Sequence, residues 1–299
     1  MYYSASDYFN ELFGSKIYKI TLKGGMSCPN RDGTISTKGC IFCSAEGSGD
    51  FAYSFDGNIK KAIDDYSKIL KNKTNANKFI AYFQDYSNTY DTPSRLEKLY
   101  LSAIDDERIV GLSIATRPDL LGEDVLDVLK RINKIKPVFV ELGLQTIHEN
   151  TADYICRGYP LSVFDKAVCD LKNIGVRVIV HQILGLPFET KEMMWETASY
   201  IGKSGADGIK FHLLYVLKGT LLEKEYKNKV FDVLSLDEYI TVLSGCIERI
   251  PKNMAIHRIT GDGAKKDLIA PIYSADKKRV LNEINRRLKA DGIVQGSKF

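Results

Sequence analysis

The sequence has no run of about eighteen apolar residues, so it contains no candidate membrane-spanning helix. Its first ten residues, MYYSASDYFN, lack the basic region and apolar stretch of a signal peptide. We therefore expect a cytoplasmic protein without a membrane partner, in a compartment that keeps thiols reduced. No Ser/His/Asp or paired-carboxylate arrangement stands out, so a conventional hydrolytic site is not indicated.

The chain also has little excess of charge. Its 299 residues include 42 basic and 38 acidic ones, and the net charge of +4 does not by itself indicate nucleic-acid binding. The carboxyl-terminal stretch 276–299 is more basic, with seven Lys or Arg against three acidic residues. It predicts either a surface for phosphates or a solvated helix face, and both interpretations stay open.

Cysteine is scarce, but three of the six cysteines lie in one stretch, MSCPNRDGTISTKGCIFCSAEGSG. Eleven residues separate Cys28 from Cys40, two separate Cys40 from Cys43, and thiolates spaced in this way bind a soft metal centre. No fourth ligand follows, which disfavours a closed zinc site. A [4Fe–4S] cluster on three thiolates leaves one iron open, and Phe42 can shield the sulfurs from water. A zinc-bound or unrelated cysteine trio is the alternative.

The ending Cys40-Ile41-Phe42-Cys43 resembles the cluster loop of radical S-adenosylmethionine (SAM) enzymes. Those enzymes usually have three residues between the first two cysteines. CPNRDGT followed by GCIFC resembles one type with a longer spacing, the YhcC/YtqA (MnmL) type, which is related to the radical SAM domain of the Elongator catalytic subunit. The resemblance implies a [4Fe–4S] cluster on Cys28, Cys40 and Cys43, SAM at the open iron, and a one-electron donor such as flavodoxin or ferredoxin.

Six β-branched or apolar segments alternate with helical patterns, as in a parallel sheet with crossover helices. The predicted strands are Lys16–Leu22, Lys78–Gln84, Ile109–Ala115, Val138–Leu142, Val176–Val180 and Gly208–Leu214, and the first helices are Ile59–Leu70 and Ser94–Ala103. An open doubly wound sheet and a barrel fit this α/β pattern equally well. The resemblance implies a partial (β/α)6 TIM-type barrel, whose active site forms at the carboxyl ends of the strands.

We expect a barrel at 1–234, with a cluster loop at 24–50, and an α/β extension at 235–299. The extension is predicted from the helices Leu236–Arg249 and Ala275–Leu288 and the strand Ala255–Ile259, and we expect it to cover the mouth of the barrel. We expect no appended RNA-binding β-barrel or acetyltransferase-sized domain. Among the remaining cysteines, Cys169 and Cys246 are predicted to be buried thiols.

The resemblance places the SAM contacts at the strand ends. The usual Gly-Gly-Glu run is absent after the second strand, and the run from Gln84 to Tyr90 takes its place. The motif from Glu141 to Thr146, ELGLQT, resembles that of related tRNA-modifying enzymes, with Glu141 expected at the ribose hydroxyls. The residues assigned to the cofactor are Phe42, Gln84, Asn88, Thr116, Arg117, Glu141, Gln145, Gln182, Gly185 and Leu214.

These assignments have simpler alternatives. Asn88 could be a turn residue, and Glu141 a buried side chain with its hydrogen bonds satisfied. Arg117 can hold a carboxylate through two hydrogen bonds, whereas Asp119 is predicted to cap the next helix. The stretch from His181 to Pro187 resembles the turn on which adenine lies, with His181 itself more typical of a core histidine.

The resemblance also implies a substrate side, but no catalytic residue is assigned. Its predicted residues are Tyr90, Arg157, His212, Tyr215, Lys218 and Arg258. Tyr159 stands where the type tends to have His, which casts doubt on any proton transfer there. Ordinary surface charge is the alternative for Lys218 and Arg258.

The predicted function is reductive cleavage of SAM to a 5′-deoxyadenosyl radical that removes a hydrogen from the substrate. Resemblance to the type implies tRNA as the partner, with the 5-substituent of the wobble uridine changed from carboxymethylaminomethyl to aminomethyl. The alternatives are a radical SAM enzyme for a small molecule and a non-enzymatic metal or iron–sulfur binding module.

Overall fold

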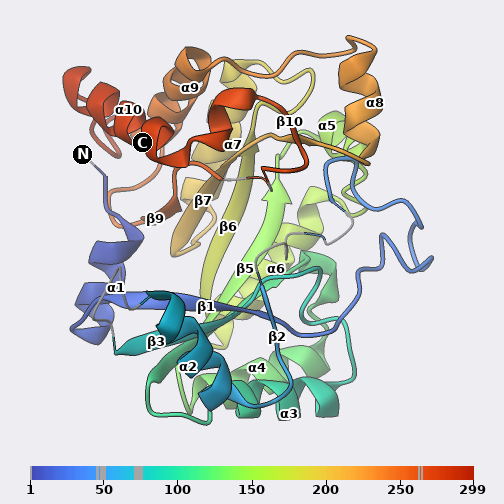
Figure 1. Ribbon diagram of the computed structural model, residues 1–299, viewed down its shortest axis with the longest axis vertical. Coiled ribbons are helices and arrows are strands. Elements are labelled where there is room, and N and C mark those ends of the chain that lie inside the picture. The colour runs from blue at the N-terminus through green and yellow to red at the C-terminus, as the bar shows by residue number, and fades with distance from the viewer. Residues whose placement is uncertain (1, 45–46, 48–51, 71–76, 262, 264) are drawn as a thin grey trace.

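The computed structural model describes residues 2–44, 47, 52–70, 77–261, 263 and 265–299 (Figure 1). One sheet has eight strands in the order β2-β1-β3-β4-β5-β6-β7-β9, and all seven pairings are parallel. The sheet curls into a partial barrel, which confirms the predicted fold class. The predicted cluster loop includes residues 45, 46 and 48–50, which lie outside the described residues.

The strands and helices alternate along most of the chain. The strands are β1 (Ile17–Lys23), β2 (Tyr53–Ser54), β3 (Lys78–Phe83), β4 (Ile109–Thr116), β5 (Val138–Gln145), β6 (Arg177–Leu184), β7 (Gly208–Leu213), β8 (Val216–Leu217), β9 (Ala255–Arg258) and β10 (Leu268–Ala270). The helices are α1 (Ala5–Phe13), α2 (Ile59–Leu70), α3 (Pro93–Ile104), α4 (Glu123–Asn133), α5 (Glu149–Tyr154), α6 (Leu161–Asn173), α7 (Lys191–Lys203), α8 (Leu221–Lys227), α9 (Leu236–Glu248) and α10 (Lys277–Ala290), with 3-10 turns at Pro118–Leu120 and Ile272–Ala275.

Helices cover the outer face of the sheet, and this layer holds the main core. Along β1, Ile20 and Leu22 are fully buried and belong to this core. The residues on either side of Ile20, Lys19 and Thr21, point to the concave face, because successive side chains of a strand alternate between faces. Phe9 of α1 packs with Phe139 and other apolar residues at the amino ends of the strands and closes that end of the barrel.

Two predicted strands ended too early. β5 continues from Leu142 to Gln145, and β6 continues from Val180 to Leu184. Polar residues such as His181 suggested loops, but a residue on the concave face of a barrel can be polar while the strand continues. The ELGLQ motif therefore lies inside β5.

Part of the extension joins the barrel itself, and its predicted cover over the mouth stays a prediction. Its strand β9 pairs in parallel with β7 and lengthens the barrel sheet, and α9 packs beside α7 on the outside. Further along, β10 pairs antiparallel with β8 as a small second sheet. The predicted boundary between 234 and 235 stays a prediction.

The cysteines outside the loop divide by burial. Cys246 is buried as predicted, whereas Cys169 is exposed, so the second prediction was wrong. Cys169 lies on the solvent side of the amphipathic α6, whose core side is formed by Phe164, Val168 and Leu171.

Among the described residues, none of the helices has the length and apolar character of a membrane span.

Candidate active site at the carboxyl ends of the strands

The three clustered cysteines lie directly after β1, at the carboxyl rim of the sheet. A backbone hydrogen bond of 3.0 Å from Cys43 N to Cys40 O closes the C-x-x-C turn. Hydrogen bonding with Cys43 lowers the pKa of Cys40 to about 7, against the effect of burial, and the nearby guanidinium groups of Arg117 and Arg31 add to this. Cys28 is close enough for its charge to act on Cys43. The three thiols therefore lie near one another on one loop, although no group of three or more His, Cys, Asp or Glu side chains among the described residues is arranged to hold a single metal ion.

Apolar residues tie the cluster loop to the barrel. Ile41 and Phe42 pack with Ile183 at the end of β6, Leu214 after β7 and Leu222 in α8. Backbone hydrogen bonds link Ile41 N to the carbonyl of Ile155 at 3.3 Å and Leu222 N to Ile41 O at 3.1 Å. This apolar packing fixes the loop on the barrel, and the shielding of the sulfurs by Phe42 stays a prediction.

Asn30 and Arg31 also support the thiols, and the sequence analysis did not assign them a role. Asn30 Nδ2 lies 2.7 Å from the carbonyl of Cys156 and 3.5 Å from Cys40 Sγ. Arg31 donates to the carbonyls of Cys43 and Ser44, holding both ends of the loop together. The sequence could have indicated a role for both residues, because they are the third and fourth residues of the motif CPNRDGT that carries the family resemblance.

Two buried amide oxygens beside the loop have no hydrogen-bond partner within the described residues: Asn30 Oδ1 and Asn88 Oδ1. Asn88 is fully buried, and its Nδ2 donates to the carbonyl of Ala115 at 3.0 Å. Buried acceptors normally have donors, so these two atoms fit a ligand that brings N–H or O–H groups. Together with three thiols on one loop, they fit an iron–sulfur cluster with SAM beside it.

The rim also holds a stacked group of Arg117, Tyr159 and Arg157. The two guanidinium carbons lie 5.0 and 4.9 Å from the centre of the Tyr159 ring. Arg117 binds Asp119 through two hydrogen bonds of 2.9 and 2.8 Å, so Asp119 pairs with it and does not cap α4 as predicted. The N-cap of α4 is Gly122. Tyr159, which stands where the type tends to have His, donates to the carbonyl of Gly143.

Arg157 is nearly fully buried, and its donors already have partners. They are the carbonyls of Thr146 at 2.7 Å and Tyr159 at 3.0 Å and the carboxylate of Glu149 at 2.8 Å. This arrangement positions the loop after β5, and a substrate contact for Arg157 stays a prediction.

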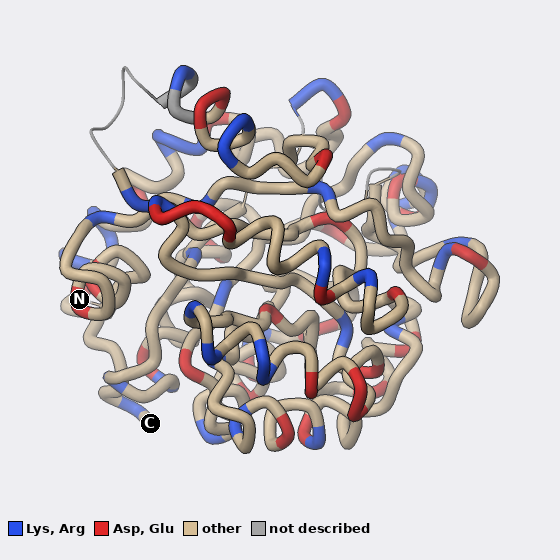
Figure 2. The backbone as a smooth tube through the Cα atoms, turned by 90° about the horizontal axis from the view of Figure 1, so that it is seen from below, with Lys and Arg blue, Asp and Glu red and all other residues tan. Residues whose placement is uncertain are grey.

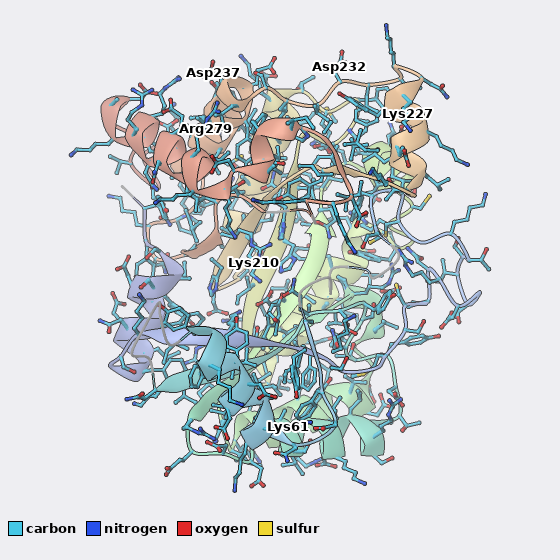
Figure 3. The ribbon with its side chains drawn as sticks, in the orientation of Figure 1. Lys61, Lys210, Lys227, Asp232, Asp237 and Arg279 are labelled. Carbon is cyan, nitrogen blue, oxygen red and sulfur yellow. The ribbon has the colours of Figure 1, made fainter. Side chains whose placement is uncertain are left out.

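Glu141 is buried on the concave face, within a polar network that crosses the barrel. One of its partners, Lys210, is labelled in Figure 3. Its Oε1 contacts Lys19 Nζ at 2.5 Å and Ser113 Oγ at 2.8 Å. Its Oε2 accepts from Tyr82 and Lys210 and lies 2.9 Å from His181 Nε2. The sequence analysis did not predict these partners of Glu141. Lys19 and Lys210 both lie within predicted strands, and a lysine there could have indicated a buried carboxylate partner.

The network shifts the pKa values of its members. Burial alone would raise the pKa of Glu141, but the ammonium groups of Lys19 and Lys210 hold it well below its usual value. Burial lowers the pKa of Lys210 to about 7, with Glu141 opposing the shift and Lys19 and Arg258 adding to it. Burial also lowers the pKa of His181 to about 4. The ribose contact of Glu141 stays a prediction.

The remaining predicted residues are spread over the rim. Thr116 shares a 2.6 Å hydrogen bond with Thr89, and Tyr90 contacts Thr34 of the cluster loop at 2.9 Å. Gly185 has a φ of 90° and packs beside Leu214 and Leu234. The backbone N–H of Gln84 donates to Leu22 O at 3.3 Å, and Gln145 ends β5 with a φ of 70°.

Three of the predicted residues do not join this group. The side chain of Gln182 lies on the helix side, where its Nε2 donates to the carbonyl of Met194 in α7 at 2.7 Å. Lys218 is exposed and donates to the carbonyl of Lys266. The ring of Tyr215 packs against the backbone of Gly261.

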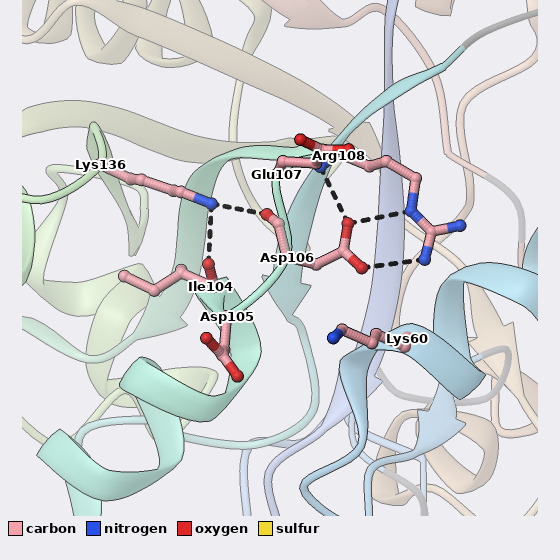
Figure 4. Close-up of a pocket in the computed structure, with 7 residues that line it drawn as sticks. All are labelled: Lys60, Ile104, Asp105, Asp106, Glu107, Arg108 and Lys136. Atoms are coloured by element: carbon pink, nitrogen blue, oxygen red, sulfur yellow. Dashed lines mark hydrogen bonds and ion pairs between the residues drawn. The ribbon is translucent and has the colours of Figure 1, made fainter.

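A pocket elsewhere has a structural explanation (Figure 4). It lies at the amino end of β4 and is lined by Lys60, Ile104, Asp105, Asp106, Glu107, Arg108 and Lys136. Arg108 pairs with Asp106 at 2.9 Å, and Lys136 donates to two backbone carbonyls. Arg108, Asp106 and Lys136 therefore have partners within the chain. Because the pocket also lies at the end of the strands opposite to the thiols, we assign it no function.

Comparison with family profiles gives matches over most of the chain. Residues 32–201 match the radical SAM superfamily, and residues 206–290 match the radical SAM C-terminal domain. The uncharacterized protein YtqA of Bacillus subtilis is 42% identical over 298 residues, covering 100% of this chain and 92% of YtqA. Protein YhcC of Escherichia coli K12 is 33% identical, covering 95% of this chain and 91% of YhcC.

More distant similarities involve larger proteins. The tRNA uridine(34) acetyltransferase of Methanocaldococcus jannaschii is 28% identical over 187 residues, which cover 62% of this chain and 34% of that protein. The structure of Elp3 from Methanocaldococcus infernus superimposes with a TM-score of 0.71 at 18% identity, covering 93% of this chain and 64% of that one. The Elp3 structure supports the fold alone.

Proposed function

The chain belongs to the radical SAM superfamily and to its YtqA/YhcC type, and from this premise we propose that it is a tRNA-modifying enzyme that uses SAM and a [4Fe–4S] cluster. Membership makes it an enzyme, so the binding-module alternative is wrong. The observation that carries the cofactor proposal is the loop with the thiols of Cys28, Cys40 and Cys43 at the carboxyl rim, beside two buried acceptors without partners within the described residues.

In this proposal Cys28, Cys40 and Cys43 would hold the cluster, with SAM beside it. The bound cofactors would supply the reductive one-electron chemistry that removes a hydrogen atom from the substrate. The side chains do the positioning. Asn30 and Asn88 offer buried acceptors to SAM, together with the other predicted cofactor residues except Gln182, whose side chain faces α7.

The protein also has to exclude water from a reactive intermediate. The apolar wall from Ile41 and Phe42 to Leu214 serves this purpose on the loop side. At the other end of the barrel, Phe9 and Phe139 close the interior. The reacting carbon of the substrate would therefore lie between an apolar base and the cluster loop.

Two observations support a tRNA substrate: the name of one relative, and the exposed basic residues of α10. The M. jannaschii relative is named as a tRNA uridine(34) acetyltransferase, which makes the wobble uridine the most specific substrate suggested for this chain. Lys and Arg alternate with Asp and Glu over much of the surface (Figure 2), so the net charge is a weak guide. On α10, however, Lys278, Arg279 and Lys289 are exposed and form no ion pair within the described residues, so they are available to phosphates.

We propose the wobble-uridine reaction in its specific form, in which a 5-carboxymethylaminomethyl substituent becomes aminomethyl. SAM would be the two-electron oxidant of the carbon–nitrogen bond to the carboxymethyl group, and water would then split the resulting imine, so that the two carbons leave as glyoxylate. The test is mass spectrometry of wobble nucleosides in tRNA from a strain lacking the gene, complemented with wild type or Cys40→Ala. Accumulation of the carboxymethylaminomethyl form in the deletion and Cys40→Ala strains supports the proposal. Unchanged wobble nucleosides would favour the alternative, a radical SAM enzyme that acts on a small molecule.

A further inference from the structure

Two cationic side chains contact a single carboxylate inside the barrel, and a third cationic residue lies on the neighbouring strand. Lys19 and Lys210 both contact Glu141, and Arg258 is the strand partner of Lys210 across the β7–β9 pair. Within the described residues, Lys19 and Lys210 form ion pairs with no other carboxylate, and Arg258 forms an ion pair with none. The interior therefore has more positive charge than its own anion can neutralise.

The strand geometry explains why these groups converge. Lys19 and Lys210 occupy inward positions of β1 and β7, and the barrel brings their ammonium groups to the two oxygens of Glu141. A shift of register between Ile209 and Lys210 adds one residue to β9, and Arg258 becomes the partner of Lys210. Backbone pairing therefore holds Arg258 beside Lys210, and its positive charge lowers the pKa of both Lys210 and His212.

Glu141 has no capacity left for a further cation. Its two oxygens already have five partners, whereas a carboxylate offers about four lone-pair directions. The neighbouring histidines add no negative charge, and His212 Nε2 is buried without a hydrogen-bond partner within the described residues. The rings of His181 and His212 lie 4.9 Å apart, so this unpartnered atom belongs to the same network.

Buried positive charge without a counter-ion is costly, and an anionic ligand relieves that cost. We propose that Lys210, Arg258 and His212 form the binding site for the carboxylate of the substrate, oriented by Glu141 and Lys19. This inference rests on the proposed function, because it identifies the anion with the carboxylate of the carboxymethylaminomethyl substituent. Glu141 acts as a positioning residue, since it contacts the cations and not the ligand.

Such a site would distinguish substrate from product. The substrate carries a carboxylate beside a protonated secondary amine, whereas the product keeps a protonated amino group alone. The cationic side chains can bind the carboxylate but have no anion to bind in the product, so the reaction removes the group that holds the substrate. Lys210 lies at the centre of the molecule, between the rim and the apolar base, as Figure 3 shows.

The test is a binding cycle on the cluster-free full-length protein. Anticodon stem-loops with carboxymethylaminomethyluridine, aminomethyluridine or uridine at the wobble position are titrated by fluorescence anisotropy at one fixed salt concentration. Wild type should bind the first about ten- to a hundredfold more tightly than the third, as a charge-assisted contact predicts. Lys210→Gln should reduce this ratio to near one, while its affinity for unmodified RNA stays the same.

Matched controls separate charge from folding. Lys210→Arg keeps the positive charge and should retain part of the preference, and Lys61→Gln removes an exposed lysine on α2 and should retain all of it. Equal melting temperatures for the variants exclude a folding defect, and where Lys210→Gln melts lower, Arg258→Gln repeats the test.

The outcomes separate the two proposals. If reconstituted wild type converts the carboxylated stem-loop but Lys210→Gln and Arg258→Gln keep the full preference, the carboxylate site is wrong and the proposed function stands. If wild type neither prefers nor converts the carboxylated stem-loop, both proposals fall.

Discussion

Lys19 Nζ lies 2.5 Å from Oε1 of Glu141, although 122 residues separate the two along the chain. The contact crosses the barrel from β1 to β5 and is matched on the other oxygen by Lys210 of β7. A carboxylate that joins three strands in this way is part of the fold as well as of the site. Its removal should therefore be measurable in both stability and binding.

Glu141→Gln should destabilise the protein by about 3–5 kcal/mol, because it leaves Lys19 and Lys210 buried without their anion. Chemical denaturation of cluster-free wild type and variant measures this difference. The double variant Glu141→Gln/Lys210→Met should recover part of the loss, since it removes one of the unpaired cations. A rise in the KM for SAM in Glu141→Gln, beyond what folding explains, would favour the ribose role over the positioning role.

Each of Cys28→Ser, Cys40→Ser and Cys43→Ser should lose the absorbance of the reconstituted cluster and form no 5′-deoxyadenosine from SAM. Cys169→Ser is the matched control, because that thiol is exposed on α6 and should leave both readouts unchanged. A cysteine variant of the loop that still cleaves SAM at the wild-type rate would contradict the assignment of the cluster ligands.

The alternation of strands and helices could be predicted because each unit carries its own local signals, whereas the choice of a barrel over an open sheet came from the family resemblance. α2 was predicted with its observed bounds, Ile59–Leu70, since its apolar residues repeat at helical spacing. The three cysteines were found because their ligand type and spacing lie within a single loop. Local patterns of this kind need no knowledge of how distant segments meet.

The interior network could not be predicted in the same way. Lys19, Lys210 and Arg258 come from three strands, and their meeting depends on register and on the shift between β7 and β9. Polar residues inside β5 and β6 were also taken as the ends of these strands. The alternation of polar and apolar residues does not show whether the concave face of a sheet is lined by polar or by apolar side chains. Gln182 illustrates the consequence, since its true position in β6 turns it toward α7.

Replacing Lys278, Arg279 and Lys289 with Gln should weaken tRNA binding most at low salt. These residues are exposed on α10 and have no ion-pair partner within the described ranges, so each can neutralise a phosphate. The slope of log Kd against log salt should fall by about two, because each lost phosphate contact contributes about 0.7–0.9. Lys61→Gln should leave the slope unchanged, and an unchanged slope in the triple variant would place the RNA on another surface.

Binding of the carboxylated stem-loop should weaken as the pH rises through about 7. Burial, Lys19 and Arg258 lower the pKa of Lys210 to about 7, with Glu141 opposing them, so free Lys210 is charged below this pH and neutral above it. The other facing groups do not titrate near pH 7: burial lowers the pKa of His181 to about 4 and that of His212 well below its usual value, and it raises the pKa of Tyr82.

Because only the charged form binds the anion, affinity is complete below pH 7 and falls by up to about tenfold per unit above it. Anisotropy titrations from pH 6 to 9 measure this dependence, with the unmodified stem-loop as the reference. Lys210→Arg should remove the dependence, since a guanidinium stays charged throughout this range. An equal pH dependence for both stem-loops in wild type would assign it to the RNA surface and not to Lys210.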